Sequence, residues 1–200
     1  MLTIKQRQTE LKYLGFYKGA IDGEENIKLK RAYKDLQDKY FFRKKDKDGI
    51  YGNDTDKLLQ SVYNVSKYTK NFDILKDKMY CHCKGKYCTG YPAIIKVSLC
   101  KNIQSERDKF GKTNITSCLR CKEWNKKQGG VSTSKHCKGG AIDFRGLYTL
   151  TLKKRIKVID YWFKLEDPNY AYCNGYYKST SKSGTITKKS MGVSIHGDVK

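Results

Sequence analysis

The chain has 200 residues, of which 42 are Lys or Arg and 20 are Asp or Glu, so its net charge is +22. No run of about eighteen apolar residues occurs, which excludes a membrane-spanning helix, and 38% hydrophobic residues with 16 tyrosines exclude extensive disorder. A positive charge this large favours a polyanionic partner: nucleic acid, an anionic membrane surface or an anionic cell wall. The first residues lack the apolar run of a signal peptide. We therefore expect the chain to stay in the cytosol where it is made.

Residues 6–64 contain no cysteine and show the apolar spacing of short helices. The segment LKYLGFYKGAIDG begins with helical spacing that its glycines interrupt, and IKLKRAYKDLQDKYF returns to that spacing. A turn and a third helix follow in DKDGIYGNDTDKLLQSVY. The Asp-Gly turn occurs twice, at Asp22-Gly23 and Asp48-Gly49. The pattern predicts a small three-helix module with repeated loops.

The order of these elements resembles the peptidoglycan-binding domain found at the ends of many cell-wall hydrolases. The similarity covers residues 6–64, through LxxLGFYxGxIDG, an Ala-Tyr-x-x-Leu-Gln helix and DGIYGxxT. It departs in the first loop, where DGEEN lacks the second glycine that DGIYG retains. The resemblance implies that residues 1–66 form a three-helix domain that binds bacterial peptidoglycan. The polar, lysine-rich residues 67–78 are then expected to be a linker.

Eight cysteines all lie after residue 80. The motifs CHCKGKYC and CLRC place five of them in two groups. Structural disulfides are unusual in a cytosolic protein, whereas clustered thiols often bind metal. Three interpretations stay open: a structural zinc, disulfides formed after release, or buried free thiols. The cysteines concerned are Cys81, Cys83, Cys88, Cys118 and Cys121.

After the cysteines begin, helical and extended patterns alternate. AIIKVSLCKNIQSERDKFG predicts an amphipathic helix that ends at Gly111, and YTLTLKKRIKVIDYWF predicts another. TNITSCLR is a short β-branched strand, and GVSIHGDVK alternates as a strand does. Residues 79–200 are therefore expected to form an α+β domain.

The segment SKHCKGGAIDFR holds His136 and Asp143, two residue types that bind zinc. Gly139 and Gly140 between them allow the backbone to turn so that both side chains meet. Only three histidines exist, and His82 sits among cysteines, so His196 is the candidate for a third ligand. In an extended segment Asp198 would point to the same side as His196.

This segment resembles the SxHxxGxAxD motif of the M15 family of zinc peptidases, which includes D-alanyl-D-alanine carboxypeptidases and L-Ala-D-Glu endopeptidases. The similarity runs over about 120 residues, from YCHCKGKYC through ITSCLRC to IHGDVK. It implies a catalytic domain over residues 79–200 with a central antiparallel sheet. The implied zinc ligands are His136, Asp143 and His196, and Arg120 matches the arginine that binds a substrate acyl or carboxylate oxygen.

Two departures from the M15 pattern affect the expected chemistry. Cys118 replaces the usual glycine of the ITSCLRC strand, and Val193 stands where better-known members have an acidic residue three positions before the third ligand. The general base must then come from elsewhere. We expect Asp198 to be that base, with Glu166 as the next residue to test.

Together the two resemblances imply an α+β bacteriophage endolysin that cuts a peptide bond in the peptidoglycan stem or cross-link with zinc-activated water. Such an enzyme would wait in the host cytoplasm until lysis and then act at the cell wall, where anionic polymers would attract its positive charge. We expect a monomer that neither inserts into membranes nor binds nucleic acid. Two alternatives are a non-catalytic wall-binding protein and a basic zinc-containing nucleic-acid-binding protein. The second leaves the His/Asp/His pattern unexplained.

Overall fold

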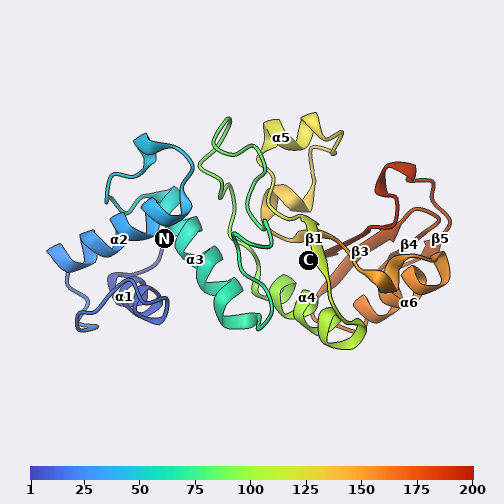
Figure 1. The fold of residues 1–200 in the computed structure, drawn as a ribbon, viewed down its shortest axis with the longest axis horizontal. Coiled ribbons are helices and arrows are strands. Elements are labelled where there is room, and N and C mark those ends of the chain that lie inside the picture. Colours follow the sequence, from blue (N-terminus) through green and yellow to red (C-terminus); the bar gives the residue numbers. More distant parts are fainter.

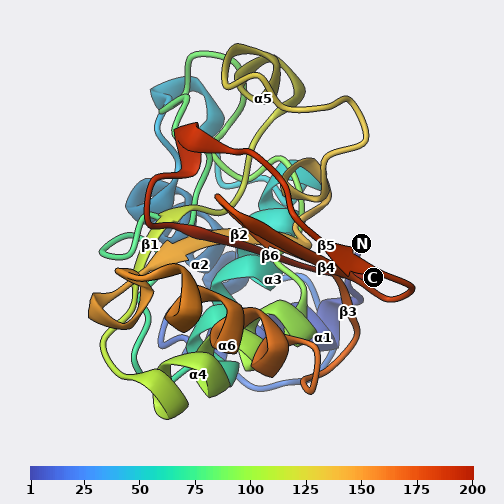
Figure 2. The ribbon, with the colours of Figure 1, turned by 90° about the vertical axis from the view of Figure 1, so that its right-hand side faces the viewer.

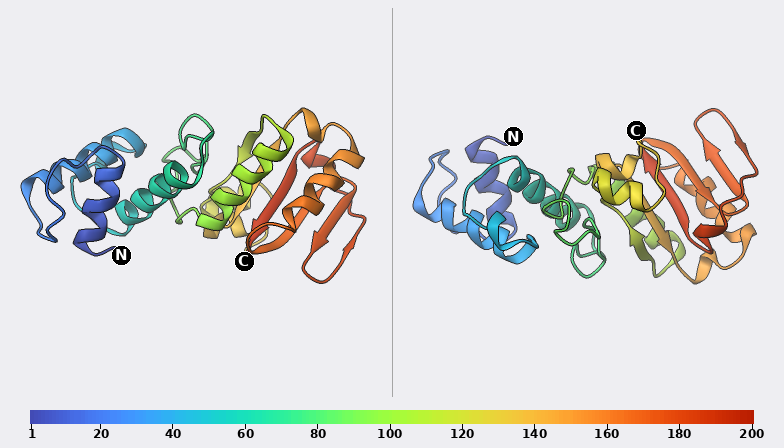
Figure 3. Two further views of the ribbon diagram at one scale, coloured as in Figure 1. Left: turned by 90° about the horizontal axis from the view of Figure 1, so that it is seen from below. Right: turned by 90° about the horizontal axis from the view of Figure 1, so that it is seen from above.

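The computed structural model describes residues 1–200 and has an α+β fold, with six α-helices and one six-stranded antiparallel sheet. The molecule is elongated (Figures 1 and 3). Helices α1 (Ile4–Tyr13), α2 (Ile27–Tyr40) and α3 (Asn53–Tyr68) lie at one end and the sheet lies at the other. None of the helices has the length and apolar character that crossing a membrane requires. The predicted α+β class with an antiparallel sheet is confirmed.

Two buried glutamines explain the repeated Asp-Gly turns of the first 68 residues. Gln8 on α1 accepts a hydrogen bond from Gly23 N at 2.9 Å and donates to the Asp22 carboxylate at 2.7 Å. Gln37 on α2 makes the same pair of contacts with Gly49 and Asp48, at 2.7 and 3.2 Å. Each glutamine side chain thus fixes one turn to the preceding helix. The repeat is therefore structural, while the peptidoglycan-binding role of these helices stays a prediction.

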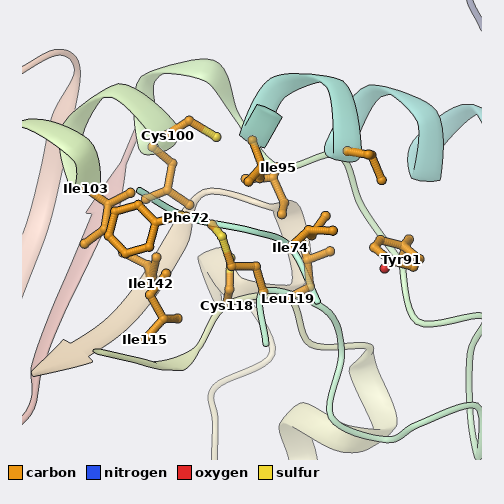
Figure 4. Close-up of a cluster of buried hydrophobic side chains, with 14 of the residues drawn as sticks. Phe72, Ile74, Tyr91, Ile95, Cys100, Ile103, Ile115, Cys118, Leu119 and Ile142 are labelled. Atoms are coloured by element: carbon orange, nitrogen blue, oxygen red, sulfur yellow. The ribbon is translucent and has the colours of Figure 1, made fainter. Parts of the chain in front are cut away.

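The segment between α3 and α4 (Val97–Phe110) packs into the core although it contains neither helix nor strand. Phe72 and Ile74 are buried, and Figure 4 shows Phe72 close to Ile103 of α4 and Ile142 of the sheet. Helix α3 is joined to the chain before α4 by a hydrogen bond from Asn64 Nδ2 to the Ile95 carbonyl at 2.8 Å. Residues 67–78, expected to be a linker, thus contribute apolar side chains to a core that both ends of the molecule share.

The sheet has the strand order β1-β2-β6-β3-β4-β5. Its strands are β1 (Asn114–Ser117), β2 (Ala141–Arg145), β3 (Pro168–Cys173), β4 (Tyr176–Ser179), β5 (Ser183–Gly184) and β6 (Ile195–Val199). Helices α4 and α6 (Leu152–Trp162) cover one face, while α5 (Lys122–Lys127) and the segment before β6 lie beyond the other face (Figure 2). The strands predicted in TNITSCLR and GVSIHGDVK are confirmed as β1 and β6, which are shorter than these segments, and the helix predicted to end at Gly111 is confirmed as α4.

The packing of α6 decides which side chains of β2 and β6 face away from the helices. The Phe144 ring stacks on Trp162 of α6, with ring centroids 5.8 Å apart. A Cβ atom on Gly197 would lie 2.7 Å from the same indole, so only glycine fits there. Because side chains alternate along a strand, the neighbours of these two residues point to the opposite face. The register pairs Asp143 with His196 on that face.

The buried carboxyl group of Glu106 on α4 is expected to make the stability of the fold depend on pH. Glu106 is fully buried and accepts a hydrogen bond from Thr113 Oγ1 at 2.9 Å, and burial raises the pKa of Glu106 to about 7. An unfolded glutamate titrates near 4.5, so ionisation destabilises the fold as pH rises from 4.5 through 7. The loss should reach about 3 kcal/mol. Glu106→Gln is therefore expected to be more stable than the wild type at pH 8 and equal to it at pH 4. Urea unfolding at both pH values checks this, and an equal difference at both would refute it.

Candidate metal centre

His136 lies in a 3-10 helix, Lys135–Lys138, that leads into β2. Its ring is buried, and Nδ1 donates a hydrogen bond to the Cys118 carbonyl at 2.6 Å. That bond fixes the tautomer in which Nε2 carries a lone pair. Cys118, which replaces a glycine of the family pattern, therefore contributes through its backbone, while its own side chain lies in the core (Figure 4).

Gly139 turns the chain between His136 and β2 in the left-handed region, with φ of 69°. A Cβ atom at this position would lie 1.8 Å from the Ile94 carbonyl oxygen. Gly139→Ala is expected to cost about 2–4 kcal/mol, because the backbone strain adds to a steric overlap with main chain. Gly129→Ala is the matched control, since Gly129 has the same φ and open space around it. Thermal unfolding should show a much larger loss for Gly139→Ala, and equal losses would contradict this.

Three donor atoms converge on the sheet face that the helices leave uncovered. Asp143 Oδ1 lies 2.8 Å from Nδ1 of His196 and 3.3 Å from Nε2 of His136. All three donor atoms lie within 4.8 Å of one another, and all three residues are buried. His136 and His196 are 60 positions apart in the sequence, and the structure brings both of them together with Asp143.

This donor set fits zinc. Zinc prefers imidazole nitrogen and carboxylate oxygen in tetrahedral arrangement with bonds of about 2.0–2.1 Å, which places ligand atoms about 3.3 Å apart. The distance from Asp143 Oδ1 to His136 Nε2 equals that value, and the distance to His196 Nδ1 is shorter, at 2.8 Å. Three protein ligands leave one position open, as in catalytic rather than structural zinc sites.

Each histidine of the triad has an outer partner that holds its ring. The Cys118 carbonyl holds His136, and Asp198 Oδ2 lies 3.4 Å from Nε2 of His196. Asp198 Oδ1 accepts hydrogen bonds from Asn169 Nδ2 and Tyr170 N, both at 2.8 Å. Metal-binding histidines usually donate their second ring nitrogen in this way, to a carbonyl or a carboxylate.

Charges around the triad favour an ionised Asp143. Burial opposes ionisation, yet hydrogen bonds from His136 and His196 hold the pKa of Asp143 well below its usual range. Burial lowers the pKa of His136. Burial also acts against protonation of His196, but its contacts with Asp143 and Asp198 raise its pKa to about 9.

A cleft of about 630 Å³ opens above Asp143. Arg120 lines it, donating to Asp143 Oδ2 at 2.5 Å and to Ser117 Oγ at 2.8 Å. Tyr172 of β3 also lines it and stacks on the His196 ring at 4.7 Å, and burial raises the pKa of Tyr172 to about 12. Sequence reasoning missed Tyr172 because β3 itself was not predicted. The period-2 pattern of NYAYC is the signal that could have found it.

The structure separates the remaining predicted residues. Asp198 lies behind His196 and, like His136 and His196 themselves, is not part of the cleft wall. Glu166 pairs with Lys101 of α4, on the side of the sheet that the helices cover, and does not line the cleft. Four cysteines form a second cluster, from which Cys118 is absent: Cys81, Cys83, Cys88 and Cys121.

Comparison with known proteins agrees with this geometry. The sequence model of a protein family described as Peptidase M15 matches residues 70–158. This region contains Arg120, His136 and Asp143 and ends before His196. A search of curated proteins finds no match. The family match supports an M15-family peptidase, and M15 peptidases are zinc-dependent metallopeptidases. The structure holds a possible His/Asp/His site for such a metal.

Proposed function

We propose that the chain is a zinc peptidase that hydrolyses a peptide bond of bacterial peptidoglycan, and that it serves as a bacteriophage endolysin. The observation that carries the peptidase proposal is the convergence of His136 Nε2, Asp143 Oδ1 and His196 Nδ1 next to an open cleft whose wall includes Asp143. A structural site would have its donor atoms closed off by a fourth protein ligand. No fourth His, Cys, Asp or Glu joins this cluster.

His136, Asp143 and His196 would hold the ion, which when bound supplies a Lewis acid able to activate water and polarise a peptide carbonyl. The chain's own residues arrange the site. Arg120 directs Nη2 and Nε at Asp143 and Ser117, which keeps its guanidinium plane fixed at the cleft wall. Its remaining N–H groups are then free to donate to a carbonyl or carboxylate oxygen of the substrate.

The role of Asp198 follows from its contacts. One carboxylate oxygen is held by Asn169 and Tyr170, and the other faces the His196 ring. A general base must turn a carboxylate oxygen to the water that it deprotonates, and both oxygens of Asp198 are already directed at other groups of the chain. We propose that Asp198 orients His196, in place of the general-base role expected from the sequence. The cleft-wall side chains that can exchange a proton include His82, Tyr172, Lys188 and Lys189.

The charge of the cleft supports an anionic peptide as substrate. Asp143 is the one carboxylate on its wall, whereas four basic side chains line it: Arg120, Arg145, Lys188 and Lys189. Stem peptides of peptidoglycan are short and carry free carboxylates. The net charge of +22 would in addition attract anionic wall polymers at long range. The N-terminal resemblance to a peptidoglycan-binding domain agrees with the same substrate.

Digestion of purified peptidoglycan tests this proposal. Mass spectrometry of the released fragments should show new peptide amino termini and no new reducing sugar ends, and chelation should prevent their release. Release of sugar ends alone would contradict a peptidase. Binding to the polymer with no release at any zinc concentration would instead identify a non-catalytic wall-binding protein.

A further inference from the structure

The four clustered cysteines come from two distant parts of the chain. Three lie in the loop of residues 81–88 and the fourth, Cys121, begins helix α5. Their sulfur atoms all lie within 4.8 Å of one another, and the Sγ atoms of Cys83 and Cys88 are 3.4 Å apart. Tetrahedral zinc with Zn–S bonds of about 2.3 Å places its sulfur ligands about 3.8 Å apart. The observed cluster has the size of that coordination shell.

The backbone around the cluster donates hydrogen bonds to sulfur. Cys121 N donates to Sγ of Cys81 at 3.2 Å, and Trp124 N donates to Sγ of Cys121 at 3.4 Å. Such N–H groups stabilise thiolates, the form that binds metal. The exposed Lys84 and Lys86 lie between the second and third cysteines. Their charges would offset the net negative charge of one divalent cation bound by four thiolates.

The loop that carries three of these cysteines has no regular secondary structure of its own. Between the end of α3 at Tyr68 and the start of α4 at Val97 there is no helix or strand. Met79, Cys81 and Tyr91 of this segment are nevertheless completely buried. Long irregular segments inside compact domains are uncommon, and those that occur are usually functional or disordered. A metal bound by both the loop and Cys121 would hold the loop in place.

We propose that Cys81, Cys83, Cys88 and Cys121 form a structural zinc site, separate from the His/Asp/His centre, that ties this loop to α5. Cys118, grouped with these residues by sequence, is excluded because its side chain is fully buried in the core between α4 and the sheet. Disulfides fit less well, because the four sulfur atoms are mutually close and not divided into two pairs.

The site has a consequence for the cleft. In the sequence, His82 lies between the proposed ligands Cys81 and Cys83, and Trp124 follows Cys121 by three residues. Both His82 and Trp124 line the cleft. Zinc bound by the four thiolates would therefore fix two parts of the cleft wall relative to each other. This step rests on the proposed function, whereas the metal site itself does not.

Zinc content of the full chain, purified under reducing conditions, tests the proposal. Two zinc ions per chain are expected in the wild type and one in Cys88→Ser. His136→Ala should also hold one, because the two sites are independent. Cys137→Ser is the matched control, since Cys137 is a partly exposed thiol outside the cluster, and it should keep two. If Cys88→Ser does not fold, Cys88→His retains a zinc ligand and should bind two.

Replacement of zinc by Co²⁺ separates the two sites by their spectra. A thiolate-to-cobalt charge-transfer band in the near ultraviolet should appear in the wild type and in His136→Ala and be absent from Cys88→Ser. Failure of the peptidase proposal would leave this band unchanged. One zinc per wild-type chain with all eight thiols titratable, an intact mass showing disulfides, or a coloured iron-containing protein would each overturn the proposal.

Discussion

His136→Ala is expected to abolish hydrolysis of peptidoglycan peptides and to lose one equivalent of zinc. The substitution removes Nε2, one of three donor atoms, and with it the bond from Nδ1 to the Cys118 carbonyl. Loss of an outer partner typically weakens metal binding 10–100-fold, and loss of a ligand should exceed the upper end of that range, more than about 100-fold. Zinc content and fragment release from purified peptidoglycan check both parts.

His82→Ala is the matched control for the metal content, because it removes an imidazole that is outside the donor set and that contacts the Lys78 carbonyl. It should keep the zinc that His136→Ala loses. A His136→Ala protein that retains its full zinc and cleaves peptides at the wild-type rate would contradict the assignment of His136 as a ligand.

Asp198→Asn is expected to weaken zinc binding about 10–100-fold and to reduce hydrolysis at limiting zinc. Asn169 Nδ2 and Tyr170 N both donate to Asp198 Oδ1, so an asparagine there would keep its oxygen toward them. Its NH₂ group would then face Nε2 of His196 and donate to it. That contact forces the hydrogen of His196 onto Nδ1, the atom that must bind the metal.

Excess zinc distinguishes this positioning role from catalysis. If Asp198 orients His196, raising the zinc concentration should restore most of the lost hydrolysis. If Asp198 is the general base, zinc affinity should stay at the wild-type value while turnover falls about 10²–10⁴-fold at all zinc concentrations. Asp167→Asn is the control. It makes the same chemical change directly before β3, at a side chain that is exposed to solvent.

The residues of the candidate site that could be predicted from the sequence are those that lie together in one short motif. His136 and Asp143 belong to one short segment, and the glycine between them that adopts a positive φ is visible in the sequence. The positioning role that we propose for Asp198 could not be predicted in the same way. It depends on Asn169 and Tyr170 of β3, whose pairing with β6 brings them against the carboxylate. Nothing local to Asp198 indicates those contacts.

The fold shows the same division between local and long-range information. Helical spacing and a terminal glycine were sufficient to predict α4, because both signals lie within the helix. The short strands β4 and β5 carry few apolar residues and were not predicted. Closeness in sequence grouped Cys118 with Cys121, yet the chain turns after β1 so that the first side chain enters the core and the second joins the cluster.

The arrangement of His136, Asp143 and His196 around one zinc ion is tested most directly by diffraction from crystals of the zinc-loaded protein at the zinc absorption edge. An anomalous-difference peak is expected among His136 Nε2, Asp143 Oδ1 and His196 Nδ1, next to the cleft that Arg120 lines. Full zinc occupancy elsewhere in the molecule, with no peak among these three atoms, would contradict the metal centre and the peptidase proposal with it.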